Sequence, residues 1–135
     1  MGERRAAGGS SATPIIFTNT STRQCFMHAY PGVAAIDANG RQLAQATRTL
    51  AGMLSGFFAG STPPDVTLDP GQAASAGVDG IDVPLGDATD CPQPAGFLVT
   101  PPNSRTSVDV RGDVPTLCAD LKVHPVVTGT DGGKP

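Results

Sequence analysis

Short apolar runs separated by turn residues recur along this chain, and several of them alternate apolar with polar side chains. Such alternation places successive side chains on opposite faces of an extended strand. The clearest alternating segments are 66–69, 97–100, 107–111 and 121–124. Asn39-Gly40, which lies between two apolar runs, favours a hairpin turn. Short strands with turn signals about every 8–12 residues are typical of an immunoglobulin-like sandwich or a barrel, so the pattern predicts an all-β protein.

The pattern changes between residues 41 and 58, where apolar residues lie at helical spacing. These residues are Leu43, Ala46, Leu50, Met53, Leu54 and Phe57. Gly52 and Gly56 would each weaken a helix by about 1 kcal/mol. We therefore predict a short helix or an irregular flap around residues 44–58.

The length of 135 residues fits one domain with two flexible ends. Residues 1–12 are rich in Gly, Ala and Ser and predict a disordered leader. Residues 13–128 form the predicted β-sandwich, and residues 129–135 form a flexible tail. The 17 Gly and 13 Pro residues lie between the apolar runs, which favours many turns over disorder.

Charge and hydropathy argue against nucleic-acid binding and against a membrane-spanning helix. The net charge is −3, whereas binding to nucleic acid needs a basic stripe. No apolar run approaches the length of about 20 residues that a membrane-spanning helix needs. Residues 1–11 also lack the apolar core of a signal peptide, which by itself favours a cytosolic protein.

The cysteines favour a different compartment. Cys91 and Cys118 flank two strands that we expect to be adjacent, and a disulfide between them would stabilise the fold by roughly 3 kcal/mol. Such a bond implies an oxidising environment. Cys25 is then a free thiol or lacks its partner. The alternative is three buried free thiols, which cytosolic proteins also contain.

An ordered set of short motifs runs through most of the chain. The segments are Phe17-Thr18-Asn19-Thr20-Ser21, Tyr30-Pro31-Gly32-Val33, Val66-Thr67-Leu68, Cys91-Pro92, Leu98-Val99-Thr100-Pro101-Pro102 and Val123-His124-Pro125-Val126-Val127, together with Cys25 and Cys118. In this order they resemble an actinobacterial, mycobacterial-type family of exported proteins, the domain of unknown function 4232 family. The resemblance covers about residues 13–127.

The resemblance implies an immunoglobulin-like, antiparallel β-sandwich in secreted or lipid-anchored envelope proteins. It assigns no catalytic or ligand-binding residue. Members of the family usually carry a signal or lipobox, followed by a first strand with a cysteine. This chain begins after both, and a truncated or misplaced start would explain the lone Cys25.

Candidate metal sites are weak. Cys25, Met27 and His28 have side chains that suit copper, but in a strand Cys25 and Met27 share one face while His28 lies on the other. Core packing with a surface histidine explains them better. The acidic residues Asp79, Asp82, Asp87 and Asp90 do not have the spacing of a calcium loop, and we expect solvated loop carboxylates. We predict no metal and no cofactor.

An enzyme is also not predicted. A Cys–His nucleophilic pair would require His28 or His124 beside an activated thiol. His124 ends an alternating strand in the position that faces solvent. No oxyanion-hole loop or orienting carboxylate can be assigned to it.

One apolar run is a candidate contact patch: Leu50, Met53, Leu54, Phe57 and Phe58. If it covers the core, it is ordinary packing. If it is exposed, it would contact a partner, a lipid or a ligand, or mediate weak self-association.

These observations lead to three hypotheses. The first is a non-catalytic, exported or envelope-associated binding or scaffolding domain whose partner is unknown. The alternative is a carrier of a lipid or a small apolar ligand, which needs a pocket of several hundred Å3 under the 50–58 flap. A thiol-dependent enzyme comes third and would need a reactive Cys25.

Overall fold

The computed structural model describes residues 1–2, 5–7, 10–50, 62–81, 83–84, 91–112, 114 and 117–132. These residues form twelve strands and no helix. The strands are β1 (Arg5–Ala7), β2 (Ser10–Thr18), β3 (Cys25–His28), β4 (Gly32–Ile36), β5 (Gln42–Gln45), β6 (Thr47–Arg48), β7 (Asp65–Leu68), β8 (Ala73–Ile81), β9 (Gly96–Thr100), β10 (Val108–Arg111), β11 (Ala119–Val123) and β12 (Val127–Thr128).

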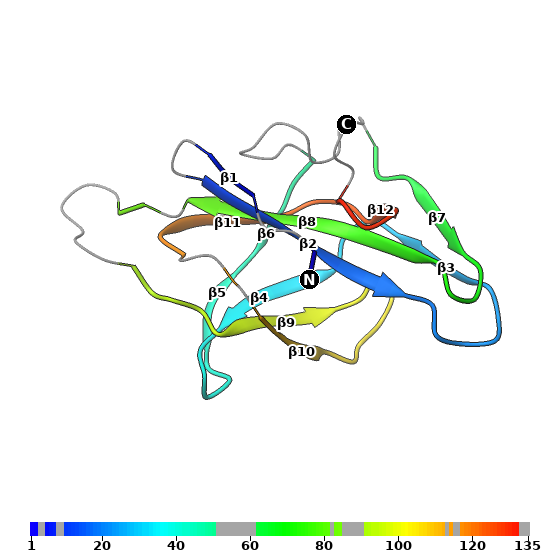
Figure 1. Ribbon diagram of the computed structural model, residues 1–135, viewed down its shortest axis with the longest axis horizontal. Coiled ribbons are helices and arrows are strands. Elements are labelled where there is room, and N and C mark those ends of the chain that lie inside the picture. The colour runs from blue at the N-terminus through cyan, green and yellow to red at the C-terminus, as the bar shows by residue number, and fades with distance from the viewer. Residues whose placement is uncertain are drawn as a thin grey trace.

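The strands form two main sheets and a small third one (Figure 1). The six-stranded sheet has the order β1-β2-β8-β11-β6, and β12 pairs with β8. The four-stranded sheet has the order β10-β9-β4-β5, and β3 pairs with β7. All of these pairs are antiparallel except β11 with β6. The predicted fold class, an all-β sandwich, is therefore confirmed.

The centre of the large sheet is β8, which pairs with β2 over nine residues without a break in register. Residues 74–80 of β8 are buried, and most of them are small. A strand covered on both faces needs no alternation of apolar and polar residues. The core then lies between Ile15, Ala76 and Val78 of this sheet and Phe97 and Val99 of the other.

Strands begin earlier in the chain than residue 13, the predicted start of the sandwich. β2 begins at Ser10, and β1 pairs with its first residues. Ala12 is fully buried because it lies opposite Asp79 of β8. At the other end, the backbone N–H of Gly132 donates to the Ser75 hydroxyl at 2.8 Å, so the first residues of the predicted tail pack on the large sheet.

The predicted helix does not form in the described part of the 44–58 segment. Residues 42–45 and 47–48 are strands, since pairing of Ala44 with Ala35 of β4 overrides the helical spacing. Residues 51–61 lie outside the described part of the chain. Within that part, no helix has the length and apolar character needed to cross a membrane.

Candidate functional site

The predicted disulfide is present. Cys91 and Cys118 are bonded across a separation of 27 residues, with their Cα atoms 4.9 Å apart. The bond joins the segment before β9 to the start of β11, where Cys118 N–H also donates to the Ile81 carbonyl. The alternative of three free thiols is therefore wrong. Cys25 is free and half-buried.

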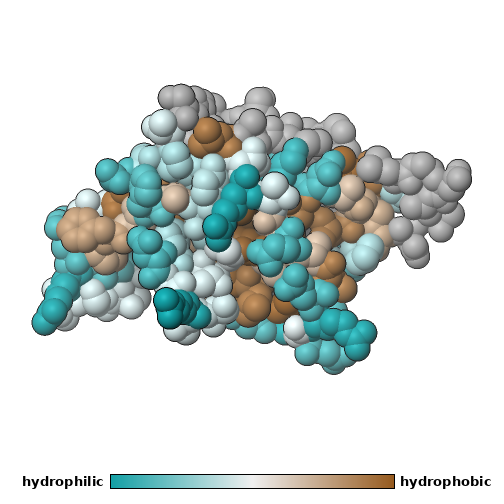
Figure 2. Space-filling view, turned by 180° about the vertical axis from the view of Figure 1, so that it is seen from behind, coloured by the Kyte–Doolittle hydropathy of each residue, from teal (hydrophilic) through white to brown (hydrophobic). Residues whose placement is uncertain are grey.

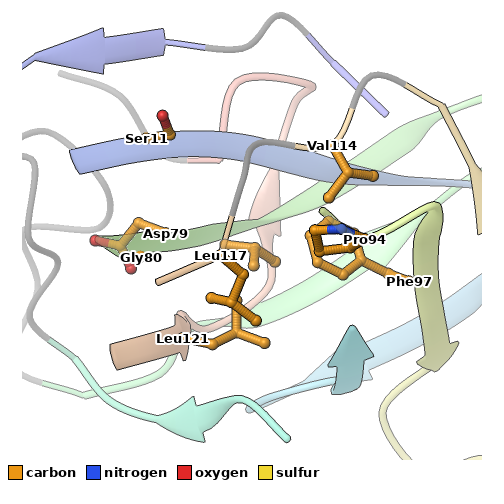
Figure 3. A pocket seen from close by; sticks show the side chains of 9 residues that line it. Ser11, Asp79, Gly80, Pro94, Phe97, Val114, Leu117 and Leu121 are labelled. Atoms are coloured by element: carbon orange, nitrogen blue, oxygen red, sulfur yellow. The ribbon is translucent and has the colours of Figure 1, made fainter. Parts of the chain in front are cut away.

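Described residues near the disulfide line a small interior cavity (Figure 3). Its volume is about 10 Å3, which is close to the minimum for a single water molecule. The apolar side chains that line it come from both sheets and from the loops between them: Val78, Pro94, Phe97, Val114, Leu117 and Leu121. This part of the sandwich is packed and leaves no room for a lipid.

The predicted contact patch is almost entirely outside the described residues. Leu50 is half-buried, whereas Met53, Leu54, Phe57 and Phe58 are not described. The pocket that they were expected to line stays a prediction.

The prediction that His124 faces solvent is wrong, because β11 ends at Val123 and the alternation ends with it. The side chain of His124 is completely buried, and its Nε2 lies 2.8 Å from Oδ1 of Asp79, which is also buried. Its Nδ1 lies 3.0 Å from the Thr49 carbonyl oxygen. Asp79 is therefore not one of the solvated loop carboxylates that we expected, and Asp82, Asp87 and Asp90 lie outside the described residues.

The His124 ring bridges two oxygen atoms. A carbonyl oxygen can only accept a hydrogen bond, so Nδ1–H donates to the Thr49 carbonyl. Nε2 and Asp79 Oδ1 share a second hydrogen bond on the other side of the ring. Since both partners are enclosed, this pair is a structural link between β8 and the end of β11.

The copper reading of β3 receives no support from the geometry. Cys25 and Met27 pack against the core, while Phe26 and His28 are exposed. His28 instead pairs with Asp65 of β7 through Nδ1 and Oδ1, 2.8 Å apart. Among the described residues, no group of three or more His, Cys, Asp and Glu side chains could hold a metal ion.

A surface groove lies where the two main sheets part, and we call it the seam groove. Its volume is about 380 Å3. One wall comes from β5 and the first residue of β6, and the other from Pro92 and the start of β11: Leu43, Ala44, Gln45, Thr47, Pro92, Leu117, Cys118, Ala119, Asp120 and Leu121. The disulfide therefore supports one of its walls directly.

The two walls of the seam groove are strand edges. Among the described strands, β5 is the last of its sheet and pairs with β4 alone. In β11, Lys122 and Val123 pair with β6, whereas residues 119–121 have no described strand beside them on that side. A shift of register occurs between Ala119 and Lys122, and Asp120 there has a positive φ of 55°. Bulges of this kind bend an edge away from regular pairing.

Sequence reasoning missed this groove because no residue in it has a chemical signature. Exposed apolar side chains give a weak signal: in the described residues, the large ones are Phe26, Leu43, Val83, Leu98 and Val108. Figure 2 shows hydrophobic side chains gathered on one half of the rear face, between hydrophilic ones. Only the folded arrangement identifies Leu43 as part of a groove.

Comparison with known proteins identifies the family. The model of the family described as "Domain of unknown function (DUF4232)" matches residues 1–130. No curated protein and no solved structure matches the chain. The match covers nearly the whole chain, and it confirms the family that the sequence resemblance indicated. This protein belongs to the DUF4232 family.

Proposed function

We propose that this protein is a non-catalytic, exported binding domain that recognises an extended segment of another polypeptide in the seam groove. The observation that carries the proposal is the edge of β5 along one wall of this groove. Such an edge offers a row of backbone donors and acceptors that an added strand can pair with, while the bulged start of β11 forms the opposite wall.

Three features support this reading over the alternatives. The cavity in the described interior holds about one water, so recognition by the described residues takes place at the surface. The disulfide fastens one wall of the groove and is consistent with an oxidising compartment outside the cytoplasm. The carrier hypothesis depends on the 50–58 flap, of which only Leu50 lies within the described residues.

The proposal can be tested by photo-crosslinking in cells that make the full-length exported protein. A photoreactive amino acid is placed at Gln45, which is exposed in the groove, and in a second strain at Asn39, which is exposed in the hairpin away from it. We expect ultraviolet light to produce a discrete adduct with another polypeptide from position 45 and not from position 39.

Two leucine variants make the test specific. Leu43 in the groove and Leu98 on β9 have exposed fractions of 38% and 37%. Leu43→Glu should reduce the adduct at position 45 at least fivefold, because it places a charge in the path of the bound strand. Leu98→Glu should leave the adduct unchanged. Equal adducts from positions 45 and 39, or an adduct insensitive to Leu43→Glu, would refute the groove as the binding site.

A further inference from the structure

A second hollow lies apart from the seam groove and shares no residue with it. Its volume is about 370 Å3, and we call it the Arg48 hollow. It is formed by the turn between β3 and β4, the turn after β9, and β6: His28, Ala29, Tyr30, Gly32, Arg48, Thr100, Pro101, Pro102, Asn103 and Ser104. Two of the motifs that define the sequence resemblance, beginning at Tyr30 and at Leu98, meet here.

The charge in this hollow is positive, although the whole chain carries a net charge of −3. None of its described lining residues is acidic. His28 at the rim already pairs with Asp65. The guanidinium of Arg48 is exposed, and it forms no ion pair or hydrogen bond with the described part of the chain. Among the described residues, Arg48 is thus a cation without a counterion, and it lies in a hollow of hydrogen-bonding side chains.

Gly32 brings the guanidinium close to the sheet. A Cβ atom added at Gly32 would lie 3.6 Å from Oγ1 of Thr100 and 4.0 Å from Nη2 of Arg48. The Arg48 side chain therefore lies over the backbone where Gly32 pairs with Thr100. A neighbouring hydroxyl and a planar guanidinium together form a set of donors for an anion.

Both turns contain a residue in the left-handed region. Asn103 has a φ of 63°, and Ser104 N–H donates to the Pro101 carbonyl at 3.1 Å, as in a type II turn with proline at its second position. Ala29 has a φ of 70°, which an alanine rarely adopts. Val126 N–H holds the Ala29 carbonyl at 2.9 Å. Strained residues of this kind gather at binding sites, where the surrounding structure fixes them.

We propose that the Arg48 hollow binds a phosphoryl group carried on a small organic body. A tetrahedral phosphoryl group presents several acceptor oxygens, and the hollow offers the Arg48 guanidinium, the Tyr30 hydroxyl and the Asn103 amide as donors. The Thr100 hydroxyl can also donate when it accepts its hydrogen bond from Ser107, whereas the Ser104 hydroxyl already donates to the Thr106 carbonyl. The volume exceeds that of the phosphoryl group alone. Tyr30, Pro101 and Pro102 give the hollow apolar surface for the rest of the ligand.

The test is a titration of the full chain followed by backbone amide NMR signals. The soluble probe is glycerol 3-phosphate, and glycerol is the control without the phosphoryl group. We expect the amide signals of Gly32, Arg48 and Ser104 to shift with glycerol 3-phosphate and not with glycerol. An absence of shifts with glycerol 3-phosphate, together with no binding to the anionic vesicles described below, would overturn the proposal.

Variants locate the site. Arg48→Gln should weaken binding by on the order of 10- to 100-fold, since it removes charge-assisted hydrogen bonds. Tyr30→Phe removes one hydroxyl and should weaken binding by about threefold to tenfold. Arg41→Gln removes an exposed arginine from the β4–β5 hairpin and should change the affinity less than twofold. Equal losses in Arg48→Gln and Arg41→Gln would mean diffuse charge attraction and would refute the site.

A vesicle arm distinguishes two sources of the phosphoryl group. Sedimentation is measured with vesicles of phosphatidylglycerol in phosphatidylcholine, and with phosphatidylcholine alone. Binding only to the anionic vesicles, lost in Arg48→Gln and displaced by glycerol 3-phosphate, identifies a lipid headgroup as the source. Shifts with glycerol 3-phosphate and no vesicle binding identify a soluble phosphate ester. Vesicle binding that Arg48→Gln leaves unchanged would contradict the proposal.

Discussion

The molecule contains two histidine–aspartate pairs that have the same nitrogen–oxygen distance and opposite surroundings. His28 and Asp65 lie on neighbouring strands with a nitrogen–oxygen distance of 2.8 Å, and their side chains are 53% and 93% exposed. His124 and Asp79 also approach to 2.8 Å, but both side chains are completely buried. The nitrogen–oxygen distance therefore says little about how much each pair contributes to stability. That contribution depends on how far each pair is buried.

The difference follows from what else each pair can bond. Water can replace either partner of the exposed pair, so its net contribution is small. In the buried pair, each polar group depends on the other and on fixed neighbours such as the Thr49 carbonyl. Removal of one partner then leaves a buried polar group without that hydrogen bond and without water to replace it. The buried pair fixes the end of β11 against β8, and the exposed pair adds little to the β3–β7 pairing.

The largest expected effect comes from breaking each pair separately. Asp79→Ala should lower the free energy of unfolding by about 3–5 kcal/mol, because it strands His124 in the interior. Asp65→Ala should lower it by less than about 1 kcal/mol. The measurement is urea unfolding followed by far-UV circular dichroism, which suits a chain with no Trp and one Tyr.

A double-mutant cycle tests whether the loss belongs to the pair. Asp79→Ala combined with His124→Ala should destabilise by clearly less than the sum of the two single changes. If Asp79→Ala does not fold, Asp79→Asn keeps the shape and an accepting oxygen and can be measured instead. Equal losses for Asp79→Ala and Asp65→Ala would show that burial does not separate the two pairs.

The disulfide gives the next largest effect and acts on the same strand junction. The bond holds the start of β11, whereas the buried pair holds its end. Cys91→Ser with Cys118→Ser should lower the free energy of unfolding by about 3.5 kcal/mol, from the closed loop of 27 residues. Cys25→Ala is the control and should cost less. Similar melting curves with and without reductant would contradict a stabilising role.

The same junction shows how far the sequence predicts the structure. Cys91 and Cys118 could be paired because turn signals placed their strands together. Phe97 and Val99 were assigned to strands by alternation, and both are in the core. The alternation failed at His124, because it holds only while the strand continues.

The central strand shows a different limit. β8 contains Ala73, Ala74, Ser75, Ala76 and Gly77 in sequence, with few of the branched or aromatic residues that mark a strand. The conformation of β8 is set by pairing with its neighbours β2 and β11. Its small side chains allow β8 to be covered on both faces. The seam groove and the Arg48 hollow depend on the same long-range pairings, so no local pattern could have predicted them.

Salt should affect the coupling energies of the two histidine–aspartate pairs differently, by less than the effect of removing the disulfide. Exposed charges are screened over a Debye length of about 8–10 Å, whereas buried pairs are screened much less. Added sodium chloride should reduce the coupling energy between His28 and Asp65 and leave that between His124 and Asp79 nearly unchanged. Double-mutant cycles at low and high salt measure both. Equal salt sensitivity would mean that solvent reaches the His124 ring.

The smallest expected effect concerns a third pair, Asp109 and Arg111 on β10. Like His28 and Asp65, this pair is exposed to solvent. The hydrogen bond from Arg111 lowers the pKa of the Asp109 carboxyl below its ordinary value of 3.8. A lowered pKa in the folded state means that the contribution to stability is present at neutral pH and disappears as the pH falls through the folded value. Arg111→Gln should return the midpoint of the Asp109 carboxyl signal in an NMR titration towards 3.8, with little change in stability at neutral pH. An unchanged midpoint would show that Arg111 does not hydrogen-bond to Asp109 in solution. A large loss of stability would show that an exposed pair can contribute as much to stability as a buried one, contrary to the comparison of His28 with His124.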